Sequence, residues 1–328
     1  MSLRVFFRLF THTQMMPVLE SGEETLVGGQ AVMEGVMMRA PHSYCVAVRK
    51  QSGEMVTEEM PLPRMSELYP IFKYPVIRGV GTLFQAMTLG LKALRFSANV
   101  AVEDLEPAQA DKKPAEVSSW AITANLLFSL AFFIFLYKFV PLYLVTALKK
   151  WYPVLEGRLA FTAADGVIRM GIFLVFLYAV SRMKDIRRVF QYHGAEHKVV
   201  FNFESGTPVT VENAQKFTTF HPRCGTSFLL VVMIVSIAVY AFIPFDTFLM
   251  KFVSRIVLLP VIAGLSYEMI RFAARRRGSV LALLTAPGLW LQRITTKPPS
   301  DDQAEVAIRA LEGAMALERK QGGELIIA

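Results

Sequence analysis

Cysteine is scarce in this sequence, because Cys45 and Cys224 are the two cysteines among 328 residues. Two cysteines cannot build the disulfide framework of a small secreted protein, and this favours a reducing, cytosolic setting for the polar parts of the chain. The first ten residues are basic and aromatic but lack a long apolar region and a small-residue cleavage site. We therefore expect no secretory signal there, and any membrane anchor must lie further along the chain.

Acidic residues are outnumbered, since 27 Asp and Glu against 35 Lys and Arg give a formal net charge of +8. A basic balance suits nucleic acid, but no pattern of stacking aromatics and no known reader motif accompanies the charge, which argues against that partner. The basic residues instead cluster beside long apolar runs, and 53% of all residues are hydrophobic. The sequence therefore predicts an integral membrane protein that has the lipid bilayer as a partner.

Four stretches are predicted to cross the membrane as helices. Residues 120–148, 159–181, 225–245 and 252–270 are apolar and of suitable length for a hydrocarbon core of about 30 Å. Asp165 and Arg169 are four residues apart in the second stretch. Because a charge at mid-membrane costs about 2.5 to 3.5 kcal/mol, we expect them to pair or to lie near the interface.

The polar segments complete an α-helical polytopic membrane protein of about four transmembrane helices with a small N-terminal α+β cytoplasmic unit. A β-hairpin is expected around Gly53, and an amphipathic helix over residues 75–100 fits either the membrane surface or a packed position on the unit. The expected divisions are an N-terminal arm (1–25), a soluble β-containing unit with the amphipathic helix (26–105), a linker (106–117), a transmembrane hairpin (118–182), a cytoplasmic loop (183–224), a second transmembrane hairpin (225–272), and an interfacial helix followed by a C-terminal docking helix (273–328).

Basic residues set the expected orientation. Residues 182–224 carry seven Lys or Arg, and four arginines follow the last apolar stretch. The positive-inside rule therefore places the central loop and both termini in the cytoplasm. Residues 279–294 are apolar but short and interrupted by Pro287, which predicts an interfacial or re-entrant helix. If that segment crosses the membrane instead, the C-terminus moves to the other side.

A short histidine motif gives the clearest chemical signal. His193 and His197 belong to the pattern His-x-x-Glu-His, which on a helix places both imidazoles on one face, about 5 to 6 Å apart at Cβ. Imidazoles at this spacing can hold one divalent metal ion, for which zinc is the expected metal. His221 and Cys224 add a third imidazole and a thiol just before the third apolar stretch. Both segments are expected at the same membrane face, so together they predict a metal site.

Two functions are compatible with such a site. In the catalytic interpretation His193 and His197 bind the metal with Cys224 or His221 as third ligand, and Glu196 is the general base of a hydrolase. Its substrate would be a membrane-associated peptide or lipid. The alternative is a non-catalytic scaffold or assembly factor with a structural metal and a protein partner. Transport ranks below both, because few polar residues lie in the apolar stretches.

Other interpretations of the same residues stay open. The histidines could be ordinary polar residues at the membrane interface, with Glu196 paired to Lys198 or Arg223. Glu204 would lie on the same helical face as His193 and is a further candidate ligand.

Three more charged residues are candidates for the site. Glu268, near one end of the fourth stretch, could accept a hydrogen bond from a ligating histidine or pair with Arg271. Glu34 and Arg39 lie in the segment that contains Gly28, Gly29 and Gly35, and they could form a buried ion pair or belong to the site. The sequence does not choose between these alternatives.

These stretches resemble the YqhQ-like family of bacterial integral membrane proteins, a domain-of-unknown-function family that carries the label "predicted metal-dependent enzyme". The resemblance rests on residues 28–39, 89–94, 192–198, 217–225, 264–268 and 305–307. It implies a multi-pass protein of the bacterial inner membrane and a metal-dependent activity. It brings no substrate, and neither substrate nor oligomeric state follows from the sequence.

Overall fold

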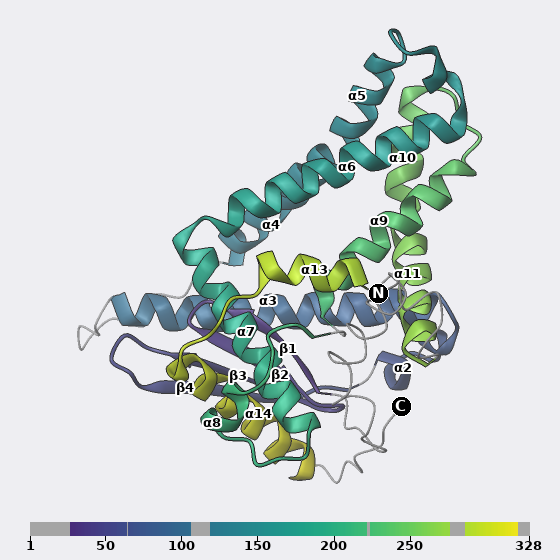
Figure 1. Cartoon of the computed structure of the whole chain (residues 1–328). Coiled ribbons are helices and arrows are strands. Elements are labelled where there is room, and N and C mark those ends of the chain that lie inside the picture. The colour runs from purple at the N-terminus through teal and green to yellow at the C-terminus, as the bar shows by residue number, and fades with distance from the viewer. Residues whose placement is uncertain (1–26, 64, 106–118, 222–223, 276–285, 321–328) are drawn as a thin grey trace, which may run out of the picture.

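The computed structural model places a small sheet and its helices at one end of the molecule and an elongated helical bundle at the other (Figure 1). It describes residues 27–63, 65–105, 119–221, 224–275 and 286–320. The arm and the linker expected at residues 1–25 and 106–117 lie outside these ranges.

Four strands form an antiparallel sheet in the order β1-β2-β3-β4. They are β1 (Gly28–Val32), β2 (Gly35–Arg39), β3 (Ser43–Arg49) and β4 (Met55–Pro61). The hairpin expected around Gly53 joins β3 to β4, and Gly53 has a φ of 89°, a backbone conformation that glycine adopts without steric cost. Successive side chains point to opposite faces, so Met38 and Met37 enter two different cores.

Helices cover both faces of the sheet. One face packs against Leu89 and Ala93 of α3 (Ile77–Leu105). The other packs against α7 (Lys184–Glu204) and α14 (Asp301–Lys320), which join a single apolar core. The C-terminal helix α14 thus packs on the sheet. Because α7 belongs to this core, most of the segment expected as a cytoplasmic loop is helix, and the sheet unit is assembled from three separate parts of the chain.

The amphipathic helix α3 is packed on the sheet unit, which was one of its two expected positions. Its opposite face leaves Phe84, Met87 and Leu94 exposed by 62%, 57% and 49%. A helix with one face in a protein core and an apolar stripe on the other is suited to lie between that core and another apolar environment, such as lipid.

The bundle contains fewer complete apolar helices than expected. Thr123–Leu148 and Arg158–Ser181 are long and apolar enough to cross a membrane. The first comprises α4 (Ser119–Ile134), the π-helical turn η2 (Phe135–Phe139) and α5 (Val140–Leu148), and the second is α6 (Arg158–Ser181). α9 (Gly225–Ala241) is apolar but shorter. The described chain is therefore mostly helical, with two candidate spans, or three if the bent pair α10 and α11 is one span.

The fourth expected stretch is broken by a proline. α10 (Phe248–Val257) and α11 (Leu259–Arg275) differ in direction by 50°. Pro260 lies in the first turn of α11, where its missing N–H group is harmless. In one continuous helix it could not donate to the carbonyl oxygen of Ile256, and its ring would clash with that carbonyl. One continuous helix over residues 252–270 is therefore replaced by two. The remaining elements are α2 (Met65–Leu68), η1 (Pro70–Lys73), η3 (Pro153–Glu156), α8 (Val211–Gln215) and α13 (Ala286–Thr295).

Candidate metal centre

Both histidines of the motif lie on α7 and are oriented by backbone carbonyls. The Nδ1 atom of His193 is 2.9 Å from the carbonyl oxygen of Thr295, and that of His197 is 2.5 Å from the carbonyl oxygen of Thr219. A carbonyl oxygen only accepts, so each Nδ1 carries the proton and donates it. The lone pair of each neutral imidazole is then on Nε2, as in most histidines that bind metals.

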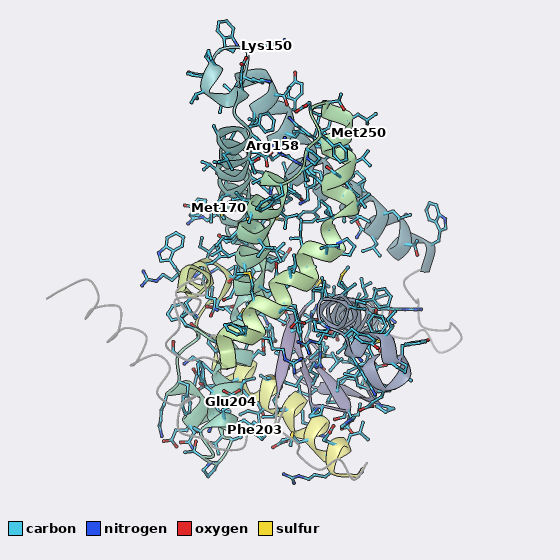
Figure 2. All side chains as sticks on the ribbon, turned by 90° about the vertical axis from the view of Figure 1, so that its right-hand side faces the viewer. Lys150, Arg158, Met170, Phe203, Glu204 and Met250 are labelled. Atoms are coloured by element: carbon cyan, nitrogen blue, oxygen red, sulfur yellow. The ribbon has the colours of Figure 1, made fainter. Side chains whose placement is uncertain are left out.

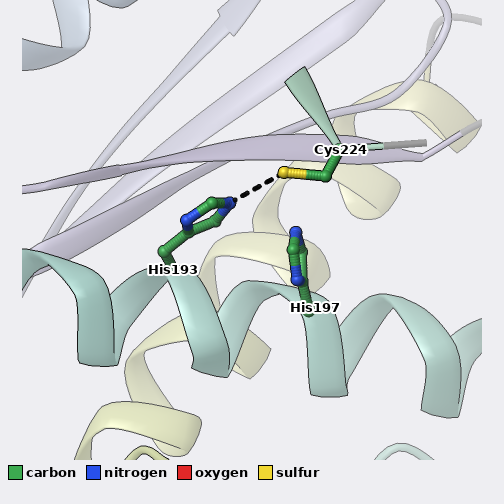
Figure 3. A group of neighbouring side chains, drawn as sticks. All are labelled: His193, His197 and Cys224. Carbon is green, nitrogen blue, oxygen red and sulfur yellow. Dashed lines mark hydrogen bonds between the residues drawn. The ribbon is translucent and has the colours of Figure 1, made fainter. Parts of the chain in front are cut away.

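Cys224 completes a group of three ligand atoms. Its Sγ atom is 3.3 Å from Nε2 of His193, and the two imidazole centroids are 4.4 Å apart (Figure 3). One ligand atom from each of the three residues lies within 4.8 Å of the others. Two imidazole nitrogens and one thiolate form a donor set that zinc accepts, and three protein ligands leave a fourth position for water.

Glu196 lies beside this group and is nearly buried, at 7% exposure. One of its carboxylate oxygens is 3.9 Å from Nε2 of His193. The alternative partner Lys198 instead donates to the carbonyl oxygens of Gln215 and Phe217, at 2.7 and 2.6 Å. Burial lowers the pKa of Lys198. The other alternative partner, Arg223, lies outside the described residues.

A glycine of the sheet allows Glu196 to take this position. A Cβ atom on Gly29 would lie 2.9 Å from Cγ of Glu196 and 2.5 Å from the carbonyl oxygen of Met37. Both distances are too short for a real side chain, so only glycine lets β1 approach α7 this closely. The glycine-rich segment therefore contributes to the site through contact with Glu196.

His221 is placed next to the three-ligand group and pairs with Glu204. Its ring centroid is 5.5 Å from that of His197, and its Nε2 atom is 3.5 Å from a carboxylate oxygen of Glu204. The backbone N–H and C=O groups of His221 exchange hydrogen bonds with the side chain of Gln292, at 2.7 and 2.8 Å. Sequence reasoning missed Gln292, although a buried glutamine in an apolar helix was a usable signal.

The other candidate residues have partners that the sequence did not reveal. Glu268 accepts hydrogen bonds from Arg78 and from the backbone N–H of Val76, so it joins α11 to α3 rather than to the histidines. Glu34 forms an ion pair with Arg188 of α7, a partner that the sequence did not indicate.

Glu34 also fixes the first half of α7 on the sheet. Its carboxylate accepts a hydrogen bond from the hydroxyl of Tyr192 at 3.3 Å. Burial, together with the nearby Glu34 carboxylate, raises the pKa of Tyr192, so this hydroxyl keeps its proton at neutral pH. Tyr192 directly precedes His193, and its anchoring helps to hold the motif in register with β1.

A cavity of about 420 Å³ adjoins the ligand group. Its wall contains His193, Glu196, His197, His221 and Cys224, together with Arg39 of β2. Gln30 of β1 and three residues of α3, Thr82, Ala86 and Leu89, also line the cavity. The site thus combines ligand atoms, a carboxylate and a guanidinium around a space large enough for a small molecule or for part of a larger one.

A family described as "Protein of unknown function (DUF1385)" matches residues 74–317. The chain belongs to this family. It is also 36% identical over 297 residues to "Uncharacterized protein YqhQ" from Bacillus subtilis (strain 168), with 89% of this chain and 92% of that protein covered. The resemblance to YqhQ-like proteins is thereby confirmed. No solved structure matches the chain. The stretch matched to the DUF1385 family includes α7 and all three residues of the ligand group, whereas β1 to β4 precede it.

Proposed function

We propose that this DUF1385 protein is a metal-dependent hydrolase that acts on a membrane-associated substrate at the cytoplasmic face, with zinc as the expected metal. The observation that carries the proposal is the group of three ligand atoms within 4.8 Å of one another, formed by His193, His197 and Cys224. The two carbonyl contacts that orient the imidazoles and the adjacent carboxylate of Glu196 support it.

The residues of the cavity have distinct roles in this proposal. His193, His197 and Cys224 would hold the metal, which when bound supplies Lewis acidity at its open position. Glu196 accepts a proton from a water molecule in the cavity and passes it to the leaving group of the substrate. Arg39 provides a fixed positive charge in the cavity wall, which favours an anionic or strongly polar group on the substrate.

The proposed location is the inner membrane of a bacterium. Four segments would cross it, namely α4 to α5, α6, α9 and the bent pair α10 and α11. The sheet unit would lie in the cytoplasm with both termini. The exposed apolar side of α3, with Phe84, Met87 and Leu94, supports this arrangement because it would contact the membrane surface. The candidate centre would then lie next to the lipid headgroups, within reach of membrane-associated substrates.

The first test is the metal content of the detergent-purified full-length chain after exposure to zinc. We expect about one zinc per wild-type chain, and a loss of affinity of at least about tenfold in His197→Ala and Cys224→Ala. Glu196→Gln should keep the metal, because it removes no ligand. His12→Ala is the matched control, since it also removes a histidine but lies far from the motif in the sequence. A folded wild-type protein that takes up no zinc would refute the proposal.

A structural metal in a non-catalytic scaffold or assembly factor is the second candidate. One observation favours it, since the ligand group and its carbonyl partners connect α7 to α9, to the end of α13 at Thr295, and to the segment around Thr219. A metal there would fasten four parts of the chain together.

Glu196 separates the two candidates. Zinc-loaded protein is incubated with phospholipid vesicles and with a peptide library, and products are detected by mass spectrometry. Hydrolysis by the wild type that falls at least about a hundredfold in Glu196→Gln supports the enzyme, because a general base contributes that much. Equal amounts of product from both proteins, or zinc binding without any product, would favour the scaffold.

A further inference from the structure

A second buried polar cluster lies in the helical bundle. Lys138 of η2, Arg169 of α6 and Arg255 of α10 lie around the ring of Tyr240 in α9, and Asp165 of α6 pairs with both arginines. Each of these residues is 9% exposed or less. Charged residues are rarely buried in apolar helices without a partner or a function, so the balance of charge in this cluster is informative.

The cluster contains three cationic side chains and one carboxylate, which pairs with two of them. Asp165 accepts hydrogen bonds from Arg169 and, at 2.6 Å, from Nη1 of Arg255. Lys138 has no such partner among the described residues, and its Nζ atom donates to the hydroxyl of Tyr240 at 3.0 Å. Arginine keeps its charge in proteins, so even a neutral lysine would leave one positive charge in excess.

Tyr240 stabilises the excess positive charge only through cation–π contacts with its ring. The three cationic groups lie 5.1 to 5.4 Å from the ring centroid, which is within the range of cation–π attraction. The hydroxyl of Tyr240 donates to the carbonyl oxygen of Arg255 at 3.3 Å, so the phenol keeps its proton and adds no negative charge. The excess of positive charge therefore remains.

One donor of the cluster is also unused. Nη1 of Arg169 donates to the hydroxyl of Ser236 at 2.7 Å and Nη2 to Asp165, but Nε of Arg169 has no hydrogen-bond partner within the part of the chain that the structure describes. The side chain is 4% exposed, so water does not replace the missing acceptor freely. In addition, Lys138 lies in a π-helical turn, a feature found frequently at functional sites.

We propose that Lys138, Arg169 and Arg255 bind a phosphate group, either free or as the headgroup of a phospholipid. A phosphate carries one to two negative charges, which matches the excess of the cluster, and both arginine and lysine recognise phosphate oxygens. The unused Nε of Arg169 supplies a directional donor for one of these oxygens. This site is separate from the candidate metal centre and does not depend on its function.

The cluster lies toward the end of the bundle opposite the sheet unit. Lys150, Arg158 and Met250 mark that end, whereas Phe203 and Glu204 lie at the other (Figure 2). Asp165 and Arg255 come seven residues after the first residues of α6 and α10, a rise of about 10 Å. A phosphate group would therefore reach the cluster from this end.

Binding is tested with the full-length chain in a non-ionic detergent, by native mass spectrometry and thermal unfolding. The probes are inorganic phosphate, phosphatidylglycerol, and diacylglycerol as the lipid without phosphate. We expect saturable binding of one phosphate probe, at least about tenfold weaker in Lys138→Met. Lys150→Met, which removes an exposed lysine at the same end, should bind like the wild type. Saturation by inorganic phosphate alone identifies a free anion, whereas binding of phosphatidylglycerol without an effect of inorganic phosphate identifies a headgroup.

Three results would overturn the proposal. The first is a wild-type chain that binds neither phosphate probe. The second is equal binding of phosphatidylglycerol and diacylglycerol, which would show that the acyl chains alone are bound. The third is equal affinity of Lys138→Met and Lys150→Met. If Lys138→Met does not fold, Lys138→Gln replaces it, because glutamine removes the charge and keeps a donor for Tyr240.

Discussion

At the scale of single residues, Gly29 controls how closely the sheet approaches Glu196. We expect Gly29→Ala to lower the free energy of unfolding by about 1 to 3 kcal/mol, because its Cβ would press on Met37 and Glu196. Gly28→Ala is the matched control, since a Cβ there would meet nothing within 4 Å, and its effect should stay within about 0.5 kcal/mol. The measurement is denaturant unfolding of the purified chain. Equal stability of the two variants would contradict the close packing of β1 on α7.

The two cysteines should differ in reactivity. Burial, and secondarily the carboxylate of Glu59, raises the pKa of the Cys45 thiol to about 12, so at neutral pH it lacks the reactive thiolate form. Cys224 lines the cavity. We expect a maleimide to modify Cys224 in metal-free protein and to leave Cys45 unmodified until the chain unfolds, as followed by peptide mass spectrometry. Zinc should slow the modification of Cys224 at least about tenfold. Rapid labelling of Cys45, or no protection by zinc, would count against these assignments.

The sequence reveals residues of the site that lie close together in the chain better than residues that lie far apart in it. His193, Glu196 and His197 lie within one helical turn or so, and their spacing predicts a shared face. The presence of Cys224 rather than His221 in the group of three ligand atoms depends on how the preceding segment folds against α7, which Lys198 and Gln292 help to fix. The partners of Glu34 and Glu268 lie 154 and 190 residues away, so no local pattern indicates them.

At the scale of elements, Glu318 fastens α14 to the turn between β2 and β3. Its carboxylate is 1% exposed and receives hydrogen bonds from the backbone N–H and Nδ1 of His42, both at 2.9 Å, and from the Ser43 hydroxyl at 2.8 Å. Burial alone would raise the pKa of Glu318, but the hydrogen bonds from His42 and Ser43 outweigh it, and its pKa is lowered. The ionised carboxylate therefore stabilises the docked helix.

These hydrogen bonds to the Glu318 carboxylate should make the free energy of unfolding depend on pH. Because the pKa is lower in the folded chain, the stabilisation is present above the unfolded value of about 4.3 and is lost as pH falls through the folded pKa. At neutral pH we expect Glu318→Gln to cost about 1 to 3 kcal/mol, with the difference from wild type shrinking in acid. Thermal unfolding across this pH range is the measurement, and the exposed Glu312→Gln in the same helix is the control. A difference that does not change with pH would exclude this role for the carboxylate.

Elements defined by local patterns were predicted well. The hairpin around Gly53 follows from alternation and a turn glycine, and α14 follows from its apolar stripe and acidic first turn. The π-helical turn η2 has no sequence signature of that kind. The break before α11 could have been found from Pro260, but the apolar composition of residues 252–270 favoured a continuous span. Composition indicates whether a helix suits a membrane and says little about where its backbone bends.

At the scale of the whole molecule, the sheet unit constrains how the bundle is connected. α7 enters the unit directly after α6, and α9 begins directly after Cys224, beside the candidate centre. α11 is held against the start of α3 through Glu268 and Arg78, and α14 returns to the sheet. The described ends of these helices therefore lie on the side of the sheet, whereas the α5–α6 and α9–α10 connections lie at the opposite end of the bundle (Figure 1). The charge pattern predicts that the central loop and the segment after α11 lie on one side of a membrane, and its assignment of that side to the cytoplasm stays a prediction.

If the bundle crosses the membrane as proposed, the two ends should differ in access to external reagents. Cells that express Lys150→Cys or Lys216→Cys are treated with a membrane-impermeant maleimide, and the wild type measures the background labelling of Cys45 and Cys224. Lys150→Cys should react in intact cells, since Lys150 is exposed at the end distant from the sheet. Lys216 is exposed by 62% on the sheet unit, and Lys216→Cys should react only after the membrane is permeabilised.

Labelling of both sites only after permeabilisation would mean that the bundle does not cross the membrane. Labelling of Lys216→Cys alone in intact cells would invert the orientation and place the candidate metal centre outside the cytoplasm.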